Sequence, residues 1–165
     1  EHRNNILHMT IAPAEVSEDV AKEAHELALR LAQGFELAGI LAIELFVTKD
    51  ERVIVNELAP RPHNSGHYTI EACSFDQFDA HIRGIAGWPL EQPELLKPAV
   101  MVNVLGQHVA PTRALIAEHP EWNMHDYCKA EVRHDRKMGH ITVLTDDTRQ
   151  TVADLERTGC WDDLK

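Results

Sequence analysis

The spacing of apolar and polar residues divides the chain into short strands and helices. Runs rich in β-branched and other apolar residues predict strands at residues 6–12, 40–47, 52–58, 99–105, 123–132 and 140–145. Apolar residues at three- and four-residue steps predict helices over residues 17–34, 76–87, 111–118 and 148–155. Because the strands do not alternate regularly with helices, this order favours an α+β fold over a βαβ repeat.

Capping residues and prolines set the expected boundaries. Ser17 is expected to cap the first long helix at its amino end, and Gly34 is expected to cap it at its carboxyl end. Thr148 is expected to cap the last helix. Two loop prolines, Pro89 and Pro98, separate two segments of the chain. We therefore expect two domains, at residues 1–90 and 91–165.

Composition argues against several classes of protein. The chain has 27 acidic and 16 basic residues and a formal charge of −11, so phosphate repulsion makes nucleic acid a poor partner. No run reaches the roughly 20 apolar residues of a membrane helix. Its three cysteines are widely spaced and form no C-x-x-C pair, which predicts free thiols in the cytoplasm. Without an initiator Met or a signal-peptide pattern, the chain is expected to start inside a longer protein.

Two glutamates occupy matching positions in the hairpin predicted at 40–47 and 52–58. A turn centred between Asp50 and Glu51 predicts the pairs Glu44–Glu57, Phe46–Val55 and Thr48–Val53. Opposed side chains lie about 5 Å apart at Cβ, so the two carboxylates indicate either a cation between them or one protonated carboxyl. Magnesium binds such oxygen ligands together with substrate phosphates. A register that differs by one residue would instead turn one glutamate to solvent.

The loop at residues 59–67 follows the second glutamate and is dense in functional groups. Its hydrogen-bonding side chains are Arg61, His63, Asn64, Ser65 and His67. Arginine offers a planar fork of donors to carboxylate or phosphate, and histidine exchanges protons near neutral pH. A zinc site at His63 and His67 is an alternative, but Pro62 and Gly66 disfavour the helix that this spacing needs.

Residues 56–72, NELAPRPHNSGHYTIEA, form the most distinctive stretch of the chain. This stretch closely resembles the signature of the 5-(carboxyamino)imidazole ribonucleotide synthases, which are ATP-grasp ligases. Further matches lie at residues 8–14, 42–47, 95–106 and 136–144. The resemblance implies the carboxyl-terminal half of an ATP-grasp fold, an antiparallel sheet with flanking helices, followed by a small mixed β subdomain.

The resemblance also implies a reaction and a cofactor. The family couples ATP cleavage to carboxylation of aminoimidazole ribonucleotide by bicarbonate, in purine biosynthesis. Positions matching Glu44 and Glu57 hold Mg²⁺ or Mn²⁺ between the ATP phosphates. Asn56 is expected to join them in binding ATP and metal, although regular strand alternation would turn its side chain to the other face.

The resemblance gives roles to the loop and to a second, basic segment. Arg61, His63 and Asn64 match catalytic positions around bicarbonate or carboxyphosphate, and Ser65 and His67 match substrate-binding positions. Lys129 and Arg136 match positions that bind the 5′-phosphate of the ribonucleotide. Cys128 stands where glycine is usual, and His134-Asp135 stand where Pro-Gly is usual, so the geometry of this turn needs a structural test.

The family's earlier domains are missing from these 165 residues. We find no glycine-rich loop for the ATP phosphates, so we expect the chain to need the amino-terminal part of the same protein for turnover. The resemblance also implies a homodimer. One alternative is a formate-dependent glycinamide ribonucleotide transformylase, which has an acidic residue and threonine where Asn64 and Ser65 stand here. The other is a non-catalytic module that regulates or only dimerises.

Overall fold

A computed structural model of the protein describes residues 1–164, which form two compact units. The first unit contains Glu1–Pro13, Tyr68–Ser74 and residues 95–164, and the second contains Ala14–His67 and Phe75–Glu94. The units do not follow the expected division at residue 90. Strand β3 (Met9–Ala12) pairs with β6 (Ala99–Leu105), so the first residues of the chain belong to the same unit as residues 95–164. Mixed helices and antiparallel sheets confirm the predicted α+β class.

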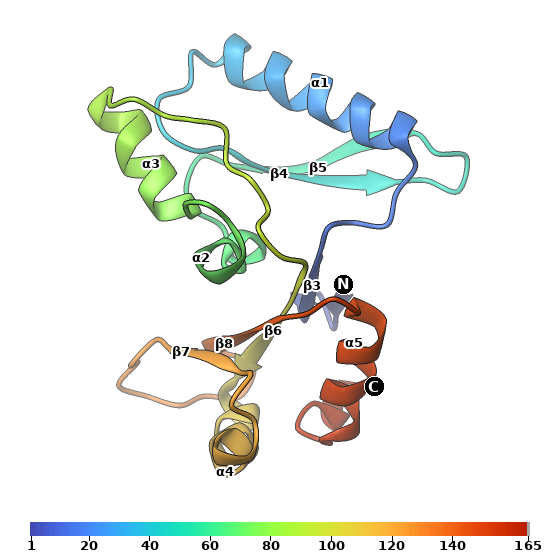
Figure 1. Ribbon diagram of the computed structural model, residues 1–165, viewed down its shortest axis with the longest axis vertical. Helices are drawn as coiled ribbons and strands as arrows, with labels where there is room; N and C mark the ends of the chain where they lie inside the picture. The colour runs from blue at the N-terminus through green and yellow to red at the C-terminus, as the bar shows by residue number, and fades with distance from the viewer. Residues whose placement is uncertain (165) are drawn as a thin grey trace. The chain divides into compact units, whose positions relative to one another are not determined.

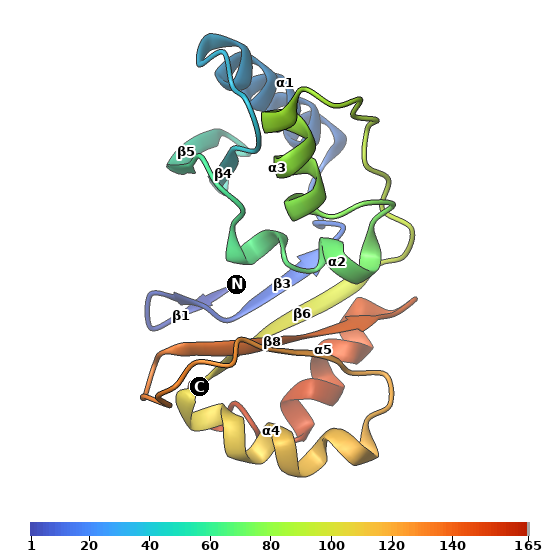
Figure 2. The ribbon, with the colours of Figure 1, turned by 90° about the vertical axis from the view of Figure 1, so that its left-hand side faces the viewer.

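The first unit is built on a four-stranded antiparallel sheet in the order β3-β6-β8-β7. Its other two strands are β8 (Lys137–Leu144) and β7 (Asn123–Asp126). Helices α4 (Val109–Leu115) and α5 (Thr148–Arg157) lie on one side of the sheet, and the short helix α2 (Thr69–Ala72) lies on the other (Figure 2). None of the helices in residues 1–164 is long and apolar enough to cross a membrane.

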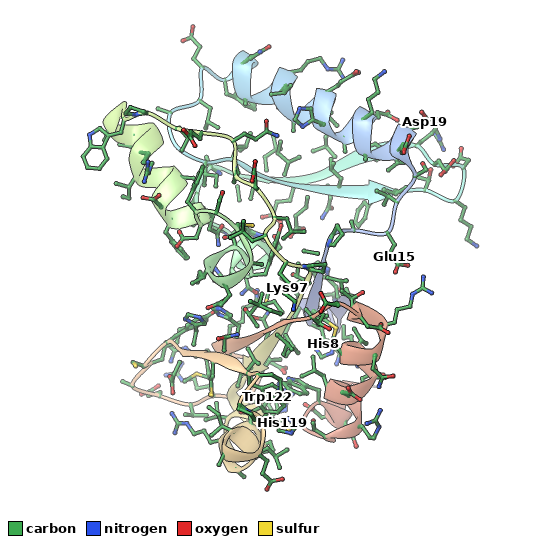
Figure 3. The ribbon with its side chains drawn as sticks, in the orientation of Figure 1. His8, Glu15, Asp19, Lys97, His119 and Trp122 are labelled. Carbon is green, nitrogen blue, oxygen red and sulfur yellow. The ribbon has the colours of Figure 1, made fainter. Side chains whose placement is uncertain are left out.

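The core of this unit surrounds the central strand. Every residue of β6 is buried, and its apolar side chains pack with Met9, Ile141, Leu155 and Trp122. Trp122 is covered by the ring of His119, which stacks on it at 4.1 Å between ring centroids (Figure 3). The sequence AVMVNVL has no regular polar alternation, as expected for a strand buried on both faces.

Several predicted boundaries in the first unit are wrong. The run at 6–12 divides at His8 into β2 (Ile6–Leu7), which pairs with β1 (His2–Arg3), and β3. The pair predicted at 123–132 and 140–145 is β7 and β8, so the turn between them is longer than expected. Cys128 and Asp135 have positive φ angles of 51° and 60° in that turn, and a β-ladder cannot continue through left-handed residues.

The remaining helix predictions shift by a few residues. The helix predicted at 111–118 begins at Val109 and ends at Leu115, between the 3₁₀ turns η2 (Gly106–His108) and η3 (Ile116–Glu118). Asp147, rather than Thr148, caps α5, because its side chain accepts a hydrogen bond from the Gln150 N–H. A final 3₁₀ turn, η4, spans Asp162–Leu164.

In the second unit, α1 (Glu18–Gly34) lies along a two-stranded hairpin (Figure 1). Ser17 caps α1 as predicted, since its Oγ accepts a hydrogen bond from the Val20 N–H. The predicted C-cap at Gly34 is wrong: Gly34 is still helical and Phe35 is the C-cap. The chain reverses at Glu36, which takes the positive φ of 48°.

Helix α3 (Gln77–Ala86) fills the range predicted at 76–87, whose two end residues are its caps. Asp76 Oδ1 accepts hydrogen bonds from the N–H groups of Phe78 and Asp79, which satisfies two of the donors left unpaired at a helix start. Gly87 ends the helix with a φ of 65°, a conformation that glycine adopts without a Cβ clash. This cap places the first residue of α3, Gln77, beneath the loop described next.

Candidate active site

The hairpin of β4 (Ala42–Val47) and β5 (Val53–Ala59) brings two carboxylates together. Glu44 pairs directly with Glu57, which confirms the predicted pairing. Their Cβ atoms are therefore about 4.5–5.5 Å apart on one face of the hairpin. The Glu44 side chain is only 23% exposed, so solvent screens the repulsion between the two charges incompletely. A cation between them would relieve that repulsion.

A β-bulge interrupts this hairpin directly beside the glutamates. The register shifts between Glu44 and Leu45, and Asn56 is the extra residue on β5. Beyond the bulge the observed pairs are Leu45–Val55, Phe46–Ile54 and Val47–Val53. The predicted pairs Phe46–Val55 and Thr48–Val53 are therefore wrong by one residue.

The bulge explains how Asn56 reaches the carboxylates. The Asn56 amide Nδ2 donates a hydrogen bond to Glu44 Oε2 at 3.2 Å, so its side chain lies on the face that carries Glu44 and Glu57. Regular alternation would have placed Asn56 on the opposite face, whereas an extra residue breaks the period of two. The expectation drawn from alternation is wrong, and the three side chains converge.

The loop after β5 brings a histidine to the same carboxylates. His63 is the N-cap of η1 (Asn64–Gly66), with its Nδ1 accepting from the Ser65 N–H and lying 2.8 Å from Ser65 Oγ. Its other ring nitrogen, Nε2, lies 3.6 Å from Glu44 Oε1. The structure therefore brings together Glu44, His63 and Ser65, which sequence reasoning placed in two separate elements.

Arg61 and Asn64 are placed differently within this loop. Arg61 is exposed, and its Nη1 donates to the Pro62 carbonyl at 3.1 Å. Asn64 opens η1, and its carbonyl accepts from the His67 N–H at 3.2 Å. No group of three metal-binding side chains of the His, Cys, Asp and Glu types occurs among residues 1–164, so the zinc alternative at His63 and His67 lacks a third ligand of these types.

Sequence reasoning missed Gln77, which is buried beneath this loop. Its side-chain amide makes two hydrogen bonds of 2.8 Å with the backbone of His63 and lies 2.8 Å from His67 Nδ1. Only its position next to the helix cap at Asp76 could have drawn attention to it. A glutamine at the start of a helix carries no sequence signal for a loop fourteen residues earlier.

The basic turn between β7 and β8 belongs to the first unit. Lys129 Nζ donates to the Lys137 carbonyl at 2.6 Å and lies 5.4 Å from the centroid of the Tyr127 ring. Arg136 Nη1 donates to the Glu131 carbonyl at 3.0 Å. Both predicted phosphate-binding side chains are thus anchored by backbone oxygens within one turn.

Two residues of this turn, which stand where the resemblance leads us to expect glycine, have a glycine-like backbone. Cys128 and Asp135 both have left-handed φ angles, which an L-residue adopts at a cost of about 1–2 kcal/mol. Asp126 Oδ1 accepts from the Cys128 N–H at 2.8 Å, and this bond together with the Arg113 guanidinium lowers the pKa of Asp126. Gln107 binds both the N–H and the carboxylate of Asp135. Side-chain hydrogen bonds, from within the turn and from Gln107, therefore hold its shape.

Comparison with known proteins identifies the family. Residues 1–78 match the ATP-grasp domain, and residues 99–154 match the phosphoribosylaminoimidazole carboxylase C-terminal domain. N5-carboxyaminoimidazole ribonucleotide synthase of Staphylococcus aureus is 48% identical over 156 residues, which is 94% of this chain. The chain matches the carboxyl-terminal part of N5-carboxyaminoimidazole ribonucleotide synthases. It spans 41% of the length of that relative.

Solved structures of this family have the same fold. The Staphylococcus aureus synthetase complexed with ADP has a TM-score of 0.93 and 45% identity, over 100% of this chain and 44% of that one. The Aspergillus clavatus synthase, in complex with ADP and 5-aminoimidazole ribonucleotide, has a TM-score of 0.88 and 32% identity, over 96% of this chain and 44% of that one. The predicted ATP-grasp fold is thereby confirmed.

Proposed function

We propose that the protein containing this chain carboxylates 5-aminoimidazole ribonucleotide, with ATP and bicarbonate as co-substrates, in purine biosynthesis. The observation that carries the proposal is the direct pairing of Glu44 with Glu57 beside Asn56 and His63. The names of the relatives support it, since the curated Staphylococcus aureus relative is an N5-carboxyaminoimidazole ribonucleotide synthase. We expect a cytoplasmic homodimer in which the rest of the protein supplies most of the ATP site.

The two glutamates fit a magnesium or manganese ion chemically. Two carboxylates on one face supply hard oxygen ligands, and Glu57 is exposed at the surface of the hairpin. Magnesium usually takes one or two protein carboxylates and fills its other positions with water and phosphate oxygens. When bound, the ion would neutralise charge on the ATP phosphates. In this proposal Glu44 and Glu57 hold the metal, and Asn56 orients Glu44 through its amide.

The loop residues would act on the anions of the reaction. A bicarbonate oxygen attacks the γ-phosphorus of ATP, ADP leaves, and carboxyphosphate forms; the amine of the ribonucleotide then attacks the carboxyl carbon and phosphate leaves. Charge develops on oxygens in both steps, and fixed donors stabilise it. The exposed Arg61 fork and the Nε2 side of His63 supply such donors. Asn64, Ser65 and His67 would complete the loop around the substrate.

The basic turn would bind the 5′-phosphate of the ribonucleotide. Lys129 and Arg136 are held in place by backbone carbonyls, so little side-chain entropy remains to be lost when an anion binds. Cys128 and Asp135 preserve the left-handed turn in place of glycine. In an acidic chain with a charge of −11, this cluster is the segment best suited to a phosphate group.

The substitution Glu57→Gln in the intact protein tests the metal role. An amide is a weaker ligand than a carboxylate and removes one negative charge, so we expect ADP formation with bicarbonate and aminoimidazole ribonucleotide to fall by about 100-fold or more. Glu91→Gln, an exposed loop residue, is the matched control and should stay within about twofold of wild type. A Glu57→Gln enzyme with nearly unchanged turnover would refute metal binding by Glu57.

Two further assays separate the alternatives. Competition between formate and bicarbonate distinguishes a transformylase from the synthase, because only the carboxylation depends on bicarbonate. Turnover by this chain alone would contradict the expectation that the amino-terminal part supplies most of the ATP site. Absence of ATP-dependent chemistry in the intact protein would favour a non-catalytic module.

A further inference from the structure

The side chain of Gln77 is buried beneath the loop of the candidate active site and hydrogen-bonded to it. It is 6% exposed at the first position of α3. Its Oε1 accepts from the His63 N–H at 2.8 Å, and its Nε2 donates to the His63 carbonyl at 2.8 Å. One amide therefore satisfies both backbone groups of His63, much as a neighbouring strand would.

These two backbone bonds fix the orientation of the amide. Because the His63 N–H requires an oxygen and the His63 carbonyl requires a donor, exchanging the oxygen and nitrogen of Gln77 would break both bonds. The same Nε2 lies 2.8 Å from His67 Nδ1. An amide nitrogen only donates, so His67 Nδ1 must accept and carry no proton. A neutral His67 consequently has its proton on Nε2.

His63 is fixed in the same tautomer by a different contact. Its Nδ1 accepts from the Ser65 N–H at 3.4 Å, which leaves the proton on Nε2, the nitrogen that faces Glu44 Oε1 at 3.6 Å. Close packing reinforces the arrangement, since a Cβ at Gly66 would lie 2.7 Å from Gln77 Oε1. Replacing Gly66 would therefore displace Gln77.

We propose that Gln77 is a positioning residue for the carboxylation reaction, which holds His63 beside Glu44 and fixes His67 as the Nε2–H tautomer. This inference rests on the proposed function for its effect on turnover. Gln77 acts through the two histidines and the loop that carries Arg61, so the anionic intermediate meets oriented donors. Supporting contacts of this kind typically change activity by about 10- to 100-fold when they are removed.

The substitution Gln77→Glu tests the role with almost no change of shape. A carboxylate cannot donate to the His63 carbonyl or to His67 Nδ1, so His67 should gain a proton on Nδ1. We expect kcat to fall about 10- to 100-fold. The ¹⁵N resonances of the His67 ring, measured on the ¹⁵N-histidine-labelled intact protein and assigned with a His67→Gln variant, should change from the Nε2–H pattern. Gln92→Glu, an exposed loop residue, adds the same charge and should change neither.

The wild-type spectrum decides the structural half of the proposal without any substitution. An Nδ1–H tautomer of His67 in the wild-type protein would overturn it, whether or not the Gln77→Glu protein folds. A folded Gln77→Glu protein with wild-type kcat would also overturn it. If the intact wild-type protein forms no ADP with bicarbonate and aminoimidazole ribonucleotide, the proposed function fails, and the tautomer still reports on Gln77 separately.

Discussion

His8 makes the stability of this protein sensitive to mild acid. It lies between β2 and β3 (Figure 3). Its side chain is 2% exposed, and neither ring nitrogen has a hydrogen-bond partner within residues 1–164. Burial lowers the pKa of His8 from 6.5 to about 4, with the nearby Arg3 acting in the same direction and Glu1 opposing it. The folded protein therefore holds His8 neutral where the unfolded chain already binds a proton.

The sign and size of the effect follow from proton linkage. Since the unfolded state binds more protons below pH 6.5, the free energy of unfolding is fully retained above that pH and falls as the pH drops toward 4. With these two pKa values, His8 removes about 2 kcal/mol of stability between pH 8 and pH 5. That loss is a substantial fraction of the roughly 5–15 kcal/mol that stabilises a typical domain.

Urea unfolding of wild type and a His8→Leu variant at the two pH values measures this contribution. Leucine has a similar volume and no proton to bind, so the variant should lose about 2 kcal/mol less than wild type between pH 8 and pH 5. His25→Leu is the control, because His25 is exposed on α1, and it should follow wild type within about 0.5 kcal/mol. Parallel pH profiles for wild type and His8→Leu would refute the assignment.

Two predictions concern backbone positions. Cys128→Gly should raise the free energy of unfolding by about 0.5–1 kcal/mol, because glycine adopts the left-handed φ of 51° without steric strain. Cys128→Ala is the control. An equal gain for Cys128→Ala would mean that loss of the thiol, and not relief of backbone strain, stabilises the protein. Gly106→Ala should lower the free energy of unfolding by about 1–3 kcal/mol and weaken aminoimidazole ribonucleotide binding, since its Cβ would lie 1.9 Å from the Arg133 carbonyl oxygen. Gly34→Ala is the control for Gly106→Ala, because a Cβ there meets nothing within 4 Å, and it should not lower the free energy of unfolding. Urea unfolding measures the stability of all these variants, and titration with aminoimidazole ribonucleotide measures ligand binding. A Gly106→Ala protein as stable as wild type would contradict the packing argument.

Several features could be predicted from the sequence because neighbouring residues determine them. Ser17 and Asp76 cap helices through bonds that reach only three residues along the chain. The hairpin of β4 and β5 follows its two strand-like runs and short turn, but that turn alone would place Glu44 opposite Asn56, and the bulge places it opposite Glu57. The loop composition at residues 59–67 similarly excludes regular structure, and the loop ends in a 3₁₀ turn as its prolines and glycine allow.

Other features could not be predicted, because they depend on bonds between separate elements. The Asn56 bulge changes the register of the hairpin by one residue, and nothing in the alternation of VIVNELA marks it. Gly34 resembled a C-cap, yet the chain continues in the helix and reverses at Glu36. In the hairpin, cross-strand pairing rather than local propensity selects the conformation.

The sequence by itself determined the α+β class, the hairpin that carries both glutamates and the loop that carries His63, since each depends on residue type and on spacing along a few positions. The tertiary structure alone decided that Asn56 joins the glutamates and that Gln77 fixes the tautomer of His67. It also decided that Cys128 and Asp135 can replace glycine. The reason is physical: hydrogen-bond geometry between distant elements depends on where the backbone is placed, and a linear sequence does not specify that placement locally.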